Sequence, residues 1–415
     1  MDNLSHSVSG LAAGELIHLS LPEESDPALQ RVRRRLLLFS AWAASNFPDL
    51  DLVLTPLLPA PLGYLLHHRG HTHTLLYAVP QALLLCALIW LCWPAARRLL
   101  GHSAGARTGL LLCVGAGFAL HMLMDSLNSY GIHPFHPFDS RWFYGDMVFI
   151  IEPLFWIAFG VPLALRLQNR FVKFGLLSFL IGAPLLFASR GFLHPASLGV
   201  LLLAAGAMAW FAQRSQARGR AVLAGAFAST LAFVALQGGA SGEAKRQLAQ
   251  ALQAGDRASR VVDAALSAFP SNPLCWRFAS IQSNEAAGSY TLSEGVLSIA
   301  PGLLPAAACP GGFGRAPLGR DAGAAIAFAG HEQGSMHALR ALQSTNCHAD
   351  AWLRFARMPR IEDGAAWDTR FGAGGDGNFS TIRFAAFKDQ PCPRGVPGWE
   401  HPRADLLAKP PKSAP

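Results

Sequence analysis

Apolar runs long enough to cross a bilayer alternate with short polar connections through roughly the first 240 residues of the chain. A transmembrane helix needs about 20 consecutive, mostly apolar residues. Six runs come close to this length, and two weaker ones precede them. The eight segments lie at 4–21, 36–47, 75–93, 108–124, 148–167, 171–188, 195–213 and 220–237. The pattern predicts a mainly α, polytopic membrane helix bundle over residues 1–238.

The pattern changes after residue 238. Apolar positions recur at helical spacing in 239–270, which predicts a juxtamembrane amphipathic helix there. These positions are Leu248, Leu252, Val262, Leu266 and Phe269. Alternating segments such as "CWRFASI" and "SYTLSEGVLSI" then predict a small β-rich domain over 271–405. The end of the chain, 406–415, contains "KPPKSAP" and is predicted to be a disordered tail.

Charge changes this picture by giving the bundle an orientation. Only 14% of the residues are charged, against about 25% in soluble proteins. The net charge of +8 comes largely from basic residues on alternate connections, beginning with "RVRRR" at 31–35. Because positively charged connections stay in the cytoplasm, the connections 48–74, 125–147 and 189–194 should face outward with the β-rich domain. The charge is thus a topology signal, and no nucleic-acid partner is expected.

Cysteine usage agrees with an outward-facing β-rich domain. The seven cysteines show no CxxC spacing, which argues against a thiolate zinc site. Three lie in apolar runs. The other four, in the last third of the chain, are Cys275, Cys309, Cys347 and Cys392. An even number of cysteines outside the cytoplasm permits disulfides.

The outward connections contain most of the candidate metal ligands. "HHRGHTHTLL" at 67–76 alone holds four histidines and an arginine. The candidate metal ligands are His6, Asp49, His68, His73, His121 and Asp125. Further candidates in the same connections are His67, His71, His133, His136, Asp139 and Asp146, and Glu152 follows them. Mixed imidazole and carboxylate ligands suit zinc, and also manganese, and one or two divalent ions could be held.

His121 and Asp125 form the strongest local pair. Four residues apart on a helix, they project from the same face and could share one ion. The alternative is a His–Asp hydrogen bond that stabilises the bundle. For Asp49 and Asp51 in "FPDLD" the alternative is a turn with side-chain-to-backbone bonds, and for His6 it is an interfacial or core histidine.

Two residues are candidates for catalysis, Asp51 and Arg69. A bound metal would activate water for attack on a phosphoester. Asp51 is then a candidate general base, and the planar guanidinium of Arg69 could hold the anionic group of the substrate. The alternative for Arg69 is an interfacial anchor for lipid headgroups.

Four motifs together resemble a known family. "MDNLSHSVSGL", "NFPDLDLV", "HHRGHTHTLL" and "HMLMDSLNSYG" resemble the successive motifs of the YdjM-type bacterial membrane-bound metal-dependent hydrolases, over residues 1 to about 150. The family pattern His-Arg-Gly-x-Thr-His falls on 68–73, with His71 at its variable position and His67 outside it. The order of motifs is also distantly similar to zinc-dependent phospholipase C, an all-helical enzyme with clustered zinc ions. That similarity would place His6, Asp49 or Asp51, His68 or His73, and His121 with Asp125 at the metal.

The resemblance implies a multi-pass protein of the bacterial inner membrane with its active site facing the periplasm. Its expected function is metal-dependent hydrolysis of a phosphoester or lipid-linked substrate at the outer face of that membrane. The expected partners are the lipid bilayer and such a substrate. The alternative is a non-catalytic membrane protein, in which the metal holds helices together or is transported, or an envelope scaffold whose β-rich domain binds a protein partner.

Overall fold

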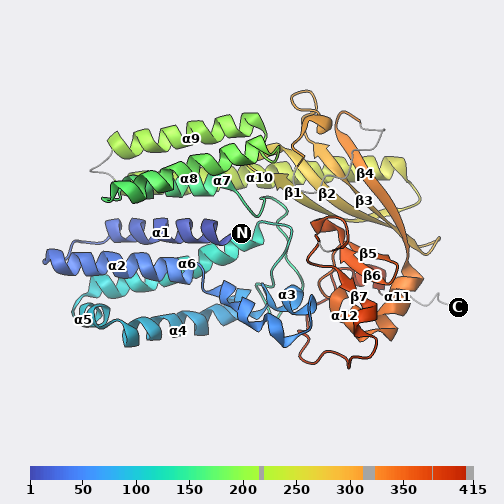
Figure 1. The fold of residues 1–415 in the computed structure, drawn as a ribbon, viewed down its shortest axis with the longest axis horizontal. Helices are drawn as coiled ribbons and strands as arrows, with labels where there is room; N and C mark the ends of the chain where they lie inside the picture. The colour runs from blue at the N-terminus through green and yellow to red at the C-terminus, as the bar shows by residue number, and fades with distance from the viewer. Residues whose placement is uncertain (215–218, 312–322, 376, 408–415) are drawn as a thin grey trace.

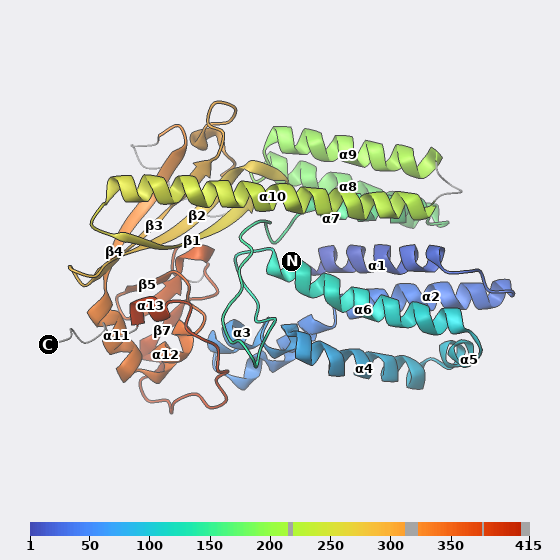
Figure 2. The ribbon, with the colours of Figure 1, turned by 180° about the vertical axis from the view of Figure 1, so that it is seen from behind.

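The computed structural model describes residues 1–214, 219–311, 323–375 and 377–407. A bundle of helices roughly parallel to one another forms one end of the molecule, and a β-rich region covers the other end (Figure 1). The view from behind shows α10 running along the bundle and onto the sheet (Figure 2). The bundle helices are α1 (Asn3–Ser20), α2 (Pro27–Ala44), α4 (Leu75–Cys92), α5 (Pro94–His102), α6 (Ala104–Ser126), α7 (Pro153–Leu165), α8 (Arg170–Ser189), α9 (Pro195–Arg214) and α10 (Gly219–Gly255).

Five of these helices, α4, α6, α8, α9 and α10, are long and apolar enough to cross a membrane. The other three predicted segments are also helical, but α1 and α2 fall below that apolarity and α7 has only 13 residues. A membrane protein is therefore confirmed, whereas the count of eight crossings stays a prediction. Large apolar side chains such as Leu111, Phe171 and Leu203 lie exposed on the helices, as expected for a surface in contact with lipid tails.

Glycines allow α1, α2 and α6 to pack closely. A Cβ on Gly117 of α6 would lie 2.5 Å from the Cβ of Ala44 in α2. A Cβ on Gly14 of α1 would lie 2.8 Å from the carbonyl oxygen of Leu37, also in α2. Small residues at such positions bring helix backbones together. The approach sets α1, which carries His6, beside α6, which carries His121.

The larger sheet is antiparallel, with the strand order β1-β2-β3-β4. Its strands are β1 (Arg260–Phe269), β2 (Asn272–Asn284), β3 (Ser289–Ser298) and β4 (Ile326–Ser335). The amphipathic helix predicted for 239–270 is wrong in its second half: α10 ends at Gly255, and β1 begins five residues later. The β-branched pair Val261–Val262 favours a strand there. The apolar residues expected on one helix face still meet, because Leu248 and Leu252 of α10 pack against Leu266 of β1.

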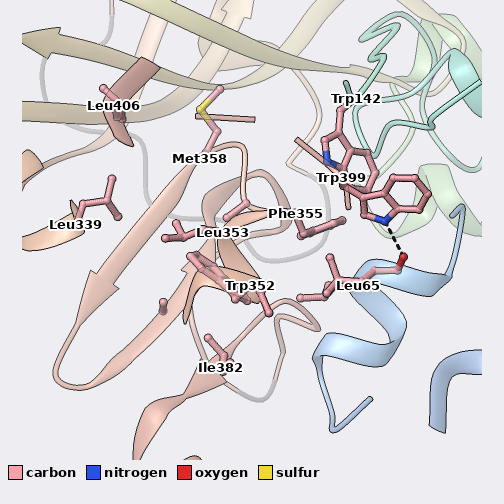
Figure 3. Close-up of a cluster of buried hydrophobic side chains, with 14 of the residues drawn as sticks. Leu65, Trp142, Leu339, Trp352, Leu353, Phe355, Met358, Ile382, Trp399 and Leu406 are labelled. Carbon is pink, nitrogen blue, oxygen red and sulfur yellow. Dashed lines mark hydrogen bonds between the residues drawn. The ribbon is translucent and has the colours of Figure 1, made fainter. Parts of the chain in front are cut away.

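A second, smaller unit follows the sheet. It contains α11 (Met336–Thr345), α12 (Cys347–Leu353), β5 (Pro359–Glu362), β6 (Ala365–Asp368), β7 (Ile382–Arg383) and α13 (Ala404–Leu407). Its buried core includes Trp352, Phe355 and Leu406, and continues into α3 (Leu62–His67) of the bundle (Figure 3). The indole N–H of Trp399 donates to the carbonyl of Leu66 at 2.9 Å. The tail predicted at 406–415 lies outside the described residues from 408 on, and Leu406 itself is buried in α13.

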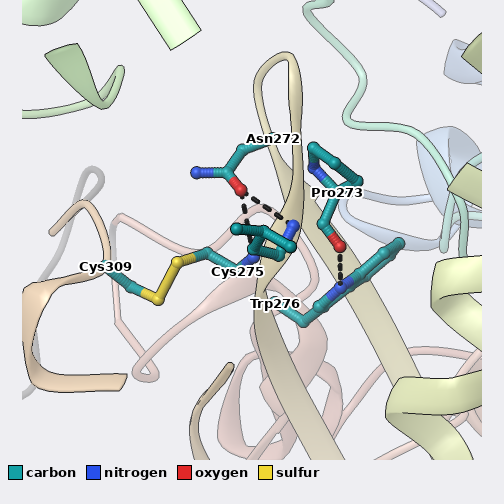
Figure 4. Close-up of a disulfide and its surroundings, with 6 residues drawn as sticks. Asn272, Pro273, Cys275, Trp276 and Cys309 are labelled. Carbon is teal, nitrogen blue, oxygen red and sulfur yellow. Dashed lines mark hydrogen bonds between the residues drawn. A yellow bond between two sulfur atoms is a disulfide. The ribbon is translucent and has the colours of Figure 1, made fainter. Parts of the chain in front are cut away.

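Two disulfides link the four cysteines of the last third of the chain. Cys275 pairs with Cys309, and Cys347 pairs with Cys392. Figure 4 shows the first bond beside Asn272, whose side chain accepts from the backbone N–H of Cys275. The disulfides that the cysteine count permitted are therefore present.

A buried arginine joins the bundle to the β-rich region. The guanidinium of Arg357 donates two hydrogen bonds to Asp146, at 2.8 and 2.9 Å, and two to Asp263 of β1, at 2.8 and 2.9 Å. Lys245 of α10 is a second cation beside Asp146, at 2.6 Å. Arg357 and Asp146 are almost fully removed from water, so each requires the other as a partner.

Candidate metal centre

Four side-chain atoms converge on one buried point in the bundle. They are one carboxylate oxygen each of Asp49 and Asp125, and the Nε2 atoms of His73 and His121. The two Nε2 atoms are 2.9 Å apart. His73 Nε2 lies 3.1 Å from Asp125 Oδ2 and 3.5 Å from Asp49 Oδ1, while His121 Nε2 lies 3.5 and 3.7 Å from the same two oxygens.

These separations fit the donor set of a divalent ion. A tetrahedral zinc site with bonds of about 2.0–2.1 Å places its donor atoms about 3.3 Å apart. Asp125 Oδ2 is fully buried, and its nearest neighbours in this group are the Nε2 atoms of His73 and His121, at 3.1 and 3.5 Å. A buried ionised oxygen is costly unless a donor or a cation faces it, and an ion bound among the four atoms would meet that need.

Local structure aims each of the four side chains. His121 and Asp125 are one turn apart on α6, as the sequence predicted. Asp49 lies in the first turn of the 3₁₀ helix η1 (Pro48–Leu57), which begins at a proline with suitable φ. His73 ends the short 3₁₀ helix η2 (His71–His73), four residues after a turn in which Arg69 adopts φ 58°.

The Nδ1 atoms of His73 and His121, which face away from the centre, also have polar partners. His121 Nδ1 lies 2.8 Å from the carbonyl oxygen of Ser45, which can only accept, so the N–H is on Nδ1 and the lone pair of Nε2 faces the centre. His73 Nδ1 lies 3.3 Å from Asp51 Oδ2 and 3.0 Å from the hydroxyl of Thr72. Metal-binding histidines are commonly held from behind in this way.

Asp51 therefore lies behind His73 and outside the group of four atoms. Asp49 and Asp51 approach opposite nitrogens of His73: Asp49 lies 3.5 Å from Nε2, and Asp51 lies 3.3 Å from Nδ1. Asp51 accepts from the backbone N–H of Arg69 at 2.9 Å and from Thr72 at 2.8 Å, and lies 3.0 Å from His68 Nδ1. Asp49, Asp51 and His68 also form a second group whose ligand atoms lie close enough to hold an ion.

Arg69 and His6 approach Asp125 through its other oxygen. Arg69 Nη2 lies 3.0 Å from Asp125 Oδ1, and its Nη1 donates to Asn128 at 3.0 Å. His6 Nε2 is 3.2 Å from the same Oδ1, which also contacts the amino nitrogen of Met1, and its ring stacks on that of His121. The Arg69 side chain is 3% exposed, so its guanidinium is buried in the protein.

Burial and charge perturb the ionisation of the groups in the connections. Burial alone would lower the pKa of His73, but hydrogen bonds with Asp125, Asp49 and Asp51 raise the pKa to about 10. Burial would raise the pKa of Asp49, but its bond with His73 and the nearby His121 lower the pKa to about 2. The carboxylates around His73 favour a positive charge between them. A bound metal ion would supply this charge in place of the proton on His73.

The remaining candidates lie elsewhere. His71, His133 and His136 surround the ring of Trp399, and His133 stacks on it at 3.9 Å between centroids. The other four are His67, which is buried on α3, Asp139, which pairs with Arg141, Asp146, which pairs with Arg357, and Glu152, which accepts from Ser271. None of the seven belongs to a metal-binding group among the described residues.

Sequence reasoning missed the groups that orient the ligands. Ser45 contributes only its backbone carbonyl, and Asn128 fixes Arg69, so neither carries a residue-type signal for metal binding. Thr72 belongs to the motif "HHRGHTHTLL", and its position directly before His73 was the one signal in the sequence for its role in orienting that ring.

The part of the chain that contains the centre matches a known protein family. Residues 1–193 match the family model described as YdjM inner membrane protein. "Uncharacterized protein YfhP" of Bacillus subtilis (strain 168) is 28% identical over 165 residues, which are 40% of this chain and 46% of the relative. The chain thus spans about half the length of that relative. No solved structure matches. The more distant similarity to zinc-dependent phospholipase C stays a prediction.

Proposed function

We propose that this chain, whose residues 1–193 match the YdjM inner membrane protein family, is a metal-dependent hydrolase of phosphoester or lipid-linked substrates. The observation that carries the proposal is the convergence of Asp49, His73, His121 and Asp125 on one point with separations that suit a tetrahedral ion. Four residues from three separate segments are needed to make that geometry.

The ligand set favours zinc, with manganese as the second choice, because two imidazoles and two carboxylates are borderline ligands. When bound, such an ion is a Lewis acid that stabilises negative charge and lowers the pKa of water. Asp51 and Arg69 then act as positioning residues: Asp51 holds His73 and the backbone of the motif, and Arg69 holds Asp125.

The least buried side of the centre lies at Asp49 and His68. Asp49 is 8% exposed and His68 12%, whereas His73, His121 and Asp125 are fully buried. His68 bonds to Asp51 through Nδ1, as in the histidine–carboxylate pairs that transfer protons in many enzymes. A substrate that approaches from this side meets His68 first, and we assign to it the proton transfer that the sequence suggested for Asp51.

The exposed surface of η1 beside Asp49 supports a lipid-linked substrate. Leu50, Val53 and Leu57 of η1 are exposed, Val53 at 74%. Exposed apolar side chains next to a polar centre suit a site at the membrane surface. The two disulfides support a location outside the cytoplasm for the β-rich region, and hence for the centre that it covers.

The test uses full-length protein in an uncharged detergent. Bound metals are counted by mass spectrometry, and hydrolysis of a generic phosphodiester and of phospholipid vesicles is followed for wild type, His121→Ala and Asp125→Asn. His136→Ala is the matched control, because that imidazole lies in an outward connection but outside the four-atom group. We expect about one ion per chain in wild type and the control, and loss of both ion and turnover in the two variants.

The burial of the ligands favours a second candidate, a non-catalytic ion that holds α6 to the motif segments. Fully enclosed sites are typical of structural zinc. An ion retained without turnover on any phosphoester would support this candidate. Wild type without an ion, at saturating zinc and neutral pH, would refute both.

A further inference from the structure

A basic cavity lies at the end of the bundle opposite the β-rich region. Its volume is about 570 Å³, and it is bounded by α2, the end of α7, α8, the end of α9 and the start of α10. Figure 1 shows these helix ends at the side of the bundle away from the sheet. The side chains that line it include Arg34, Arg166, Lys173 and Gln213. None of the metal-centre residues contributes to it.

A buried carboxylate organises the two arginines. Glu15 of α1 is fully buried and accepts from Arg34 Nε at 2.9 Å and from Arg166 Nε at 3.0 Å. Both arginines use Nε for this bond, and no hydrogen bond joins their terminal Nη groups to another described residue. Each planar guanidinium is therefore fixed at one edge and free to donate at the other.

The cavity has an excess of positive charge. Arg34, Arg166 and Lys173 face it with Glu15 as their counter-charge, which leaves a surplus of two positive charges. Lys173 has no ion-pair partner in the described part of the chain. Gly219 leaves room for this arrangement: a Cβ there would collide with Arg166 Nη1. The glycine at the start of α10 thus lets the guanidinium lie against the backbone.

We propose that this cavity binds a phosphate-bearing anion. Arginine forks match the paired oxygens of phosphate, and a lysine adds a point charge. Basic pockets between membrane helices on the cytoplasmic side receive phospholipid headgroups, and basic residues mark this end of the bundle as the cytoplasmic one. The apolar lining from Leu165, Val222 and Leu223 suits the uncharged part of a phosphoester. A lipid headgroup and a soluble phosphoester share this chemistry.

The experiment measures the binding of four probes by full-length protein in an uncharged detergent. The probes are phosphatidylglycerol, phosphatidylcholine, glycerol phosphate and inorganic phosphate, and binding is read from the rise in melting temperature during titration. Lys173→Gln removes one cation from the cavity. Arg170→Gln is the matched control, because it removes one exposed cation from the same helix outside the lining.

We expect a saturable rise with phosphatidylglycerol or with a soluble phosphate, about five-fold weaker binding by Lys173→Gln, and unchanged binding by the control. An effect of phosphatidylglycerol alone identifies a lipid headgroup, and an equal effect of glycerol phosphate identifies a soluble ester. Arg166→Gln is a second variant, and its melting temperature without ligand separates a folding defect from lost binding. Equal weakening by Lys173→Gln and Arg170→Gln, or no saturable response to any probe, would overturn the proposal.

Discussion

Glu152 gives a prediction about pH that can be worked out from the structure. Its carboxylate precedes α7, accepts from the backbone N–H of Leu154 at 3.1 Å and from that of Ser271 at 2.9 Å, and also contacts the Ser271 hydroxyl. Burial raises the pKa of Glu152 from 4.5 to about 7, in spite of these hydrogen bonds. Ser271 belongs to the turn between β1 and β2, so the contact holds the sheet against the bundle.

The sign follows from proton binding. Between pH 4.5 and 7 the folded protein holds this proton more tightly than the unfolded chain, so stability falls as the pH rises through this range. The contribution is complete below about pH 4.5 and is lost above about pH 7. A difference of 2.5 pKa units (7 minus 4.5) corresponds to roughly 3 kcal/mol, as an order of magnitude.

The assay compares wild type with Glu152→Gln by thermal unfolding from pH 5 to pH 8. Glutamine does not titrate, so the stability of the variant relative to wild type should rise across this range, whatever constant it loses from one altered hydrogen bond. Glu243→Gln is the control, because a bond with Arg246 lowers the pKa of Glu243 to about 2 and it stays ionised throughout. A wild type-to-Glu152→Gln difference that does not change with pH would refute the reasoning.

Three further predictions follow from packing and charge. Arg357→Ala should destabilise the protein by about 3 kcal/mol, because Asp146 and Asp263 lose the buried cation they share and keep only Lys245 and Arg403; an unchanged melting temperature would contradict this. Replacing Cys347 and Cys392 by serine should cost roughly 4 kcal/mol through the 45-residue separation, measured by denaturant unfolding. Gly117→Ala should cost about 1–3 kcal/mol and reduce bound metal, because the added methyl group separates α6 from α2; full metal occupancy would show that the centre tolerates this shift.

The sequence predicted those features that depend on local spacing. Helical periodicity located the bundle helices, and the four-residue spacing of His121 and Asp125 correctly placed them on one face. Asp49 and His73 were predicted from residue type and from their position in connections on the same side of the membrane. The structure brings both to the same point.

Features that depend on contacts between residues far apart in the chain could not be predicted from the sequence. Asp146 and Glu152 are carboxylates like two of the ligands and lie in or just after an outward connection, but their partners are Arg357 and Ser271, which lie 211 and 119 residues away. The directions of Asp51 and Arg69 depend on a 3₁₀ turn and on a residue with positive φ, which residue type alone does not specify. The end of α10 was misplaced because one apolar spacing was shared by a helix and the strand that packs on it.

The bond between Trp399 and Leu66 affects how shortened forms of the protein should be interpreted. A Cβ on Gly70 would lie 3.3 Å from the Trp399 ring, so the far end of the chain packs beside the turn from which His68 and His73 project. A truncation before this tryptophan would remove that packing without deleting any ligand. Weaker zinc retention by such a fragment would then reflect a loosened turn, and only restoring the aromatic ring at this position could distinguish that effect from a missing ligand.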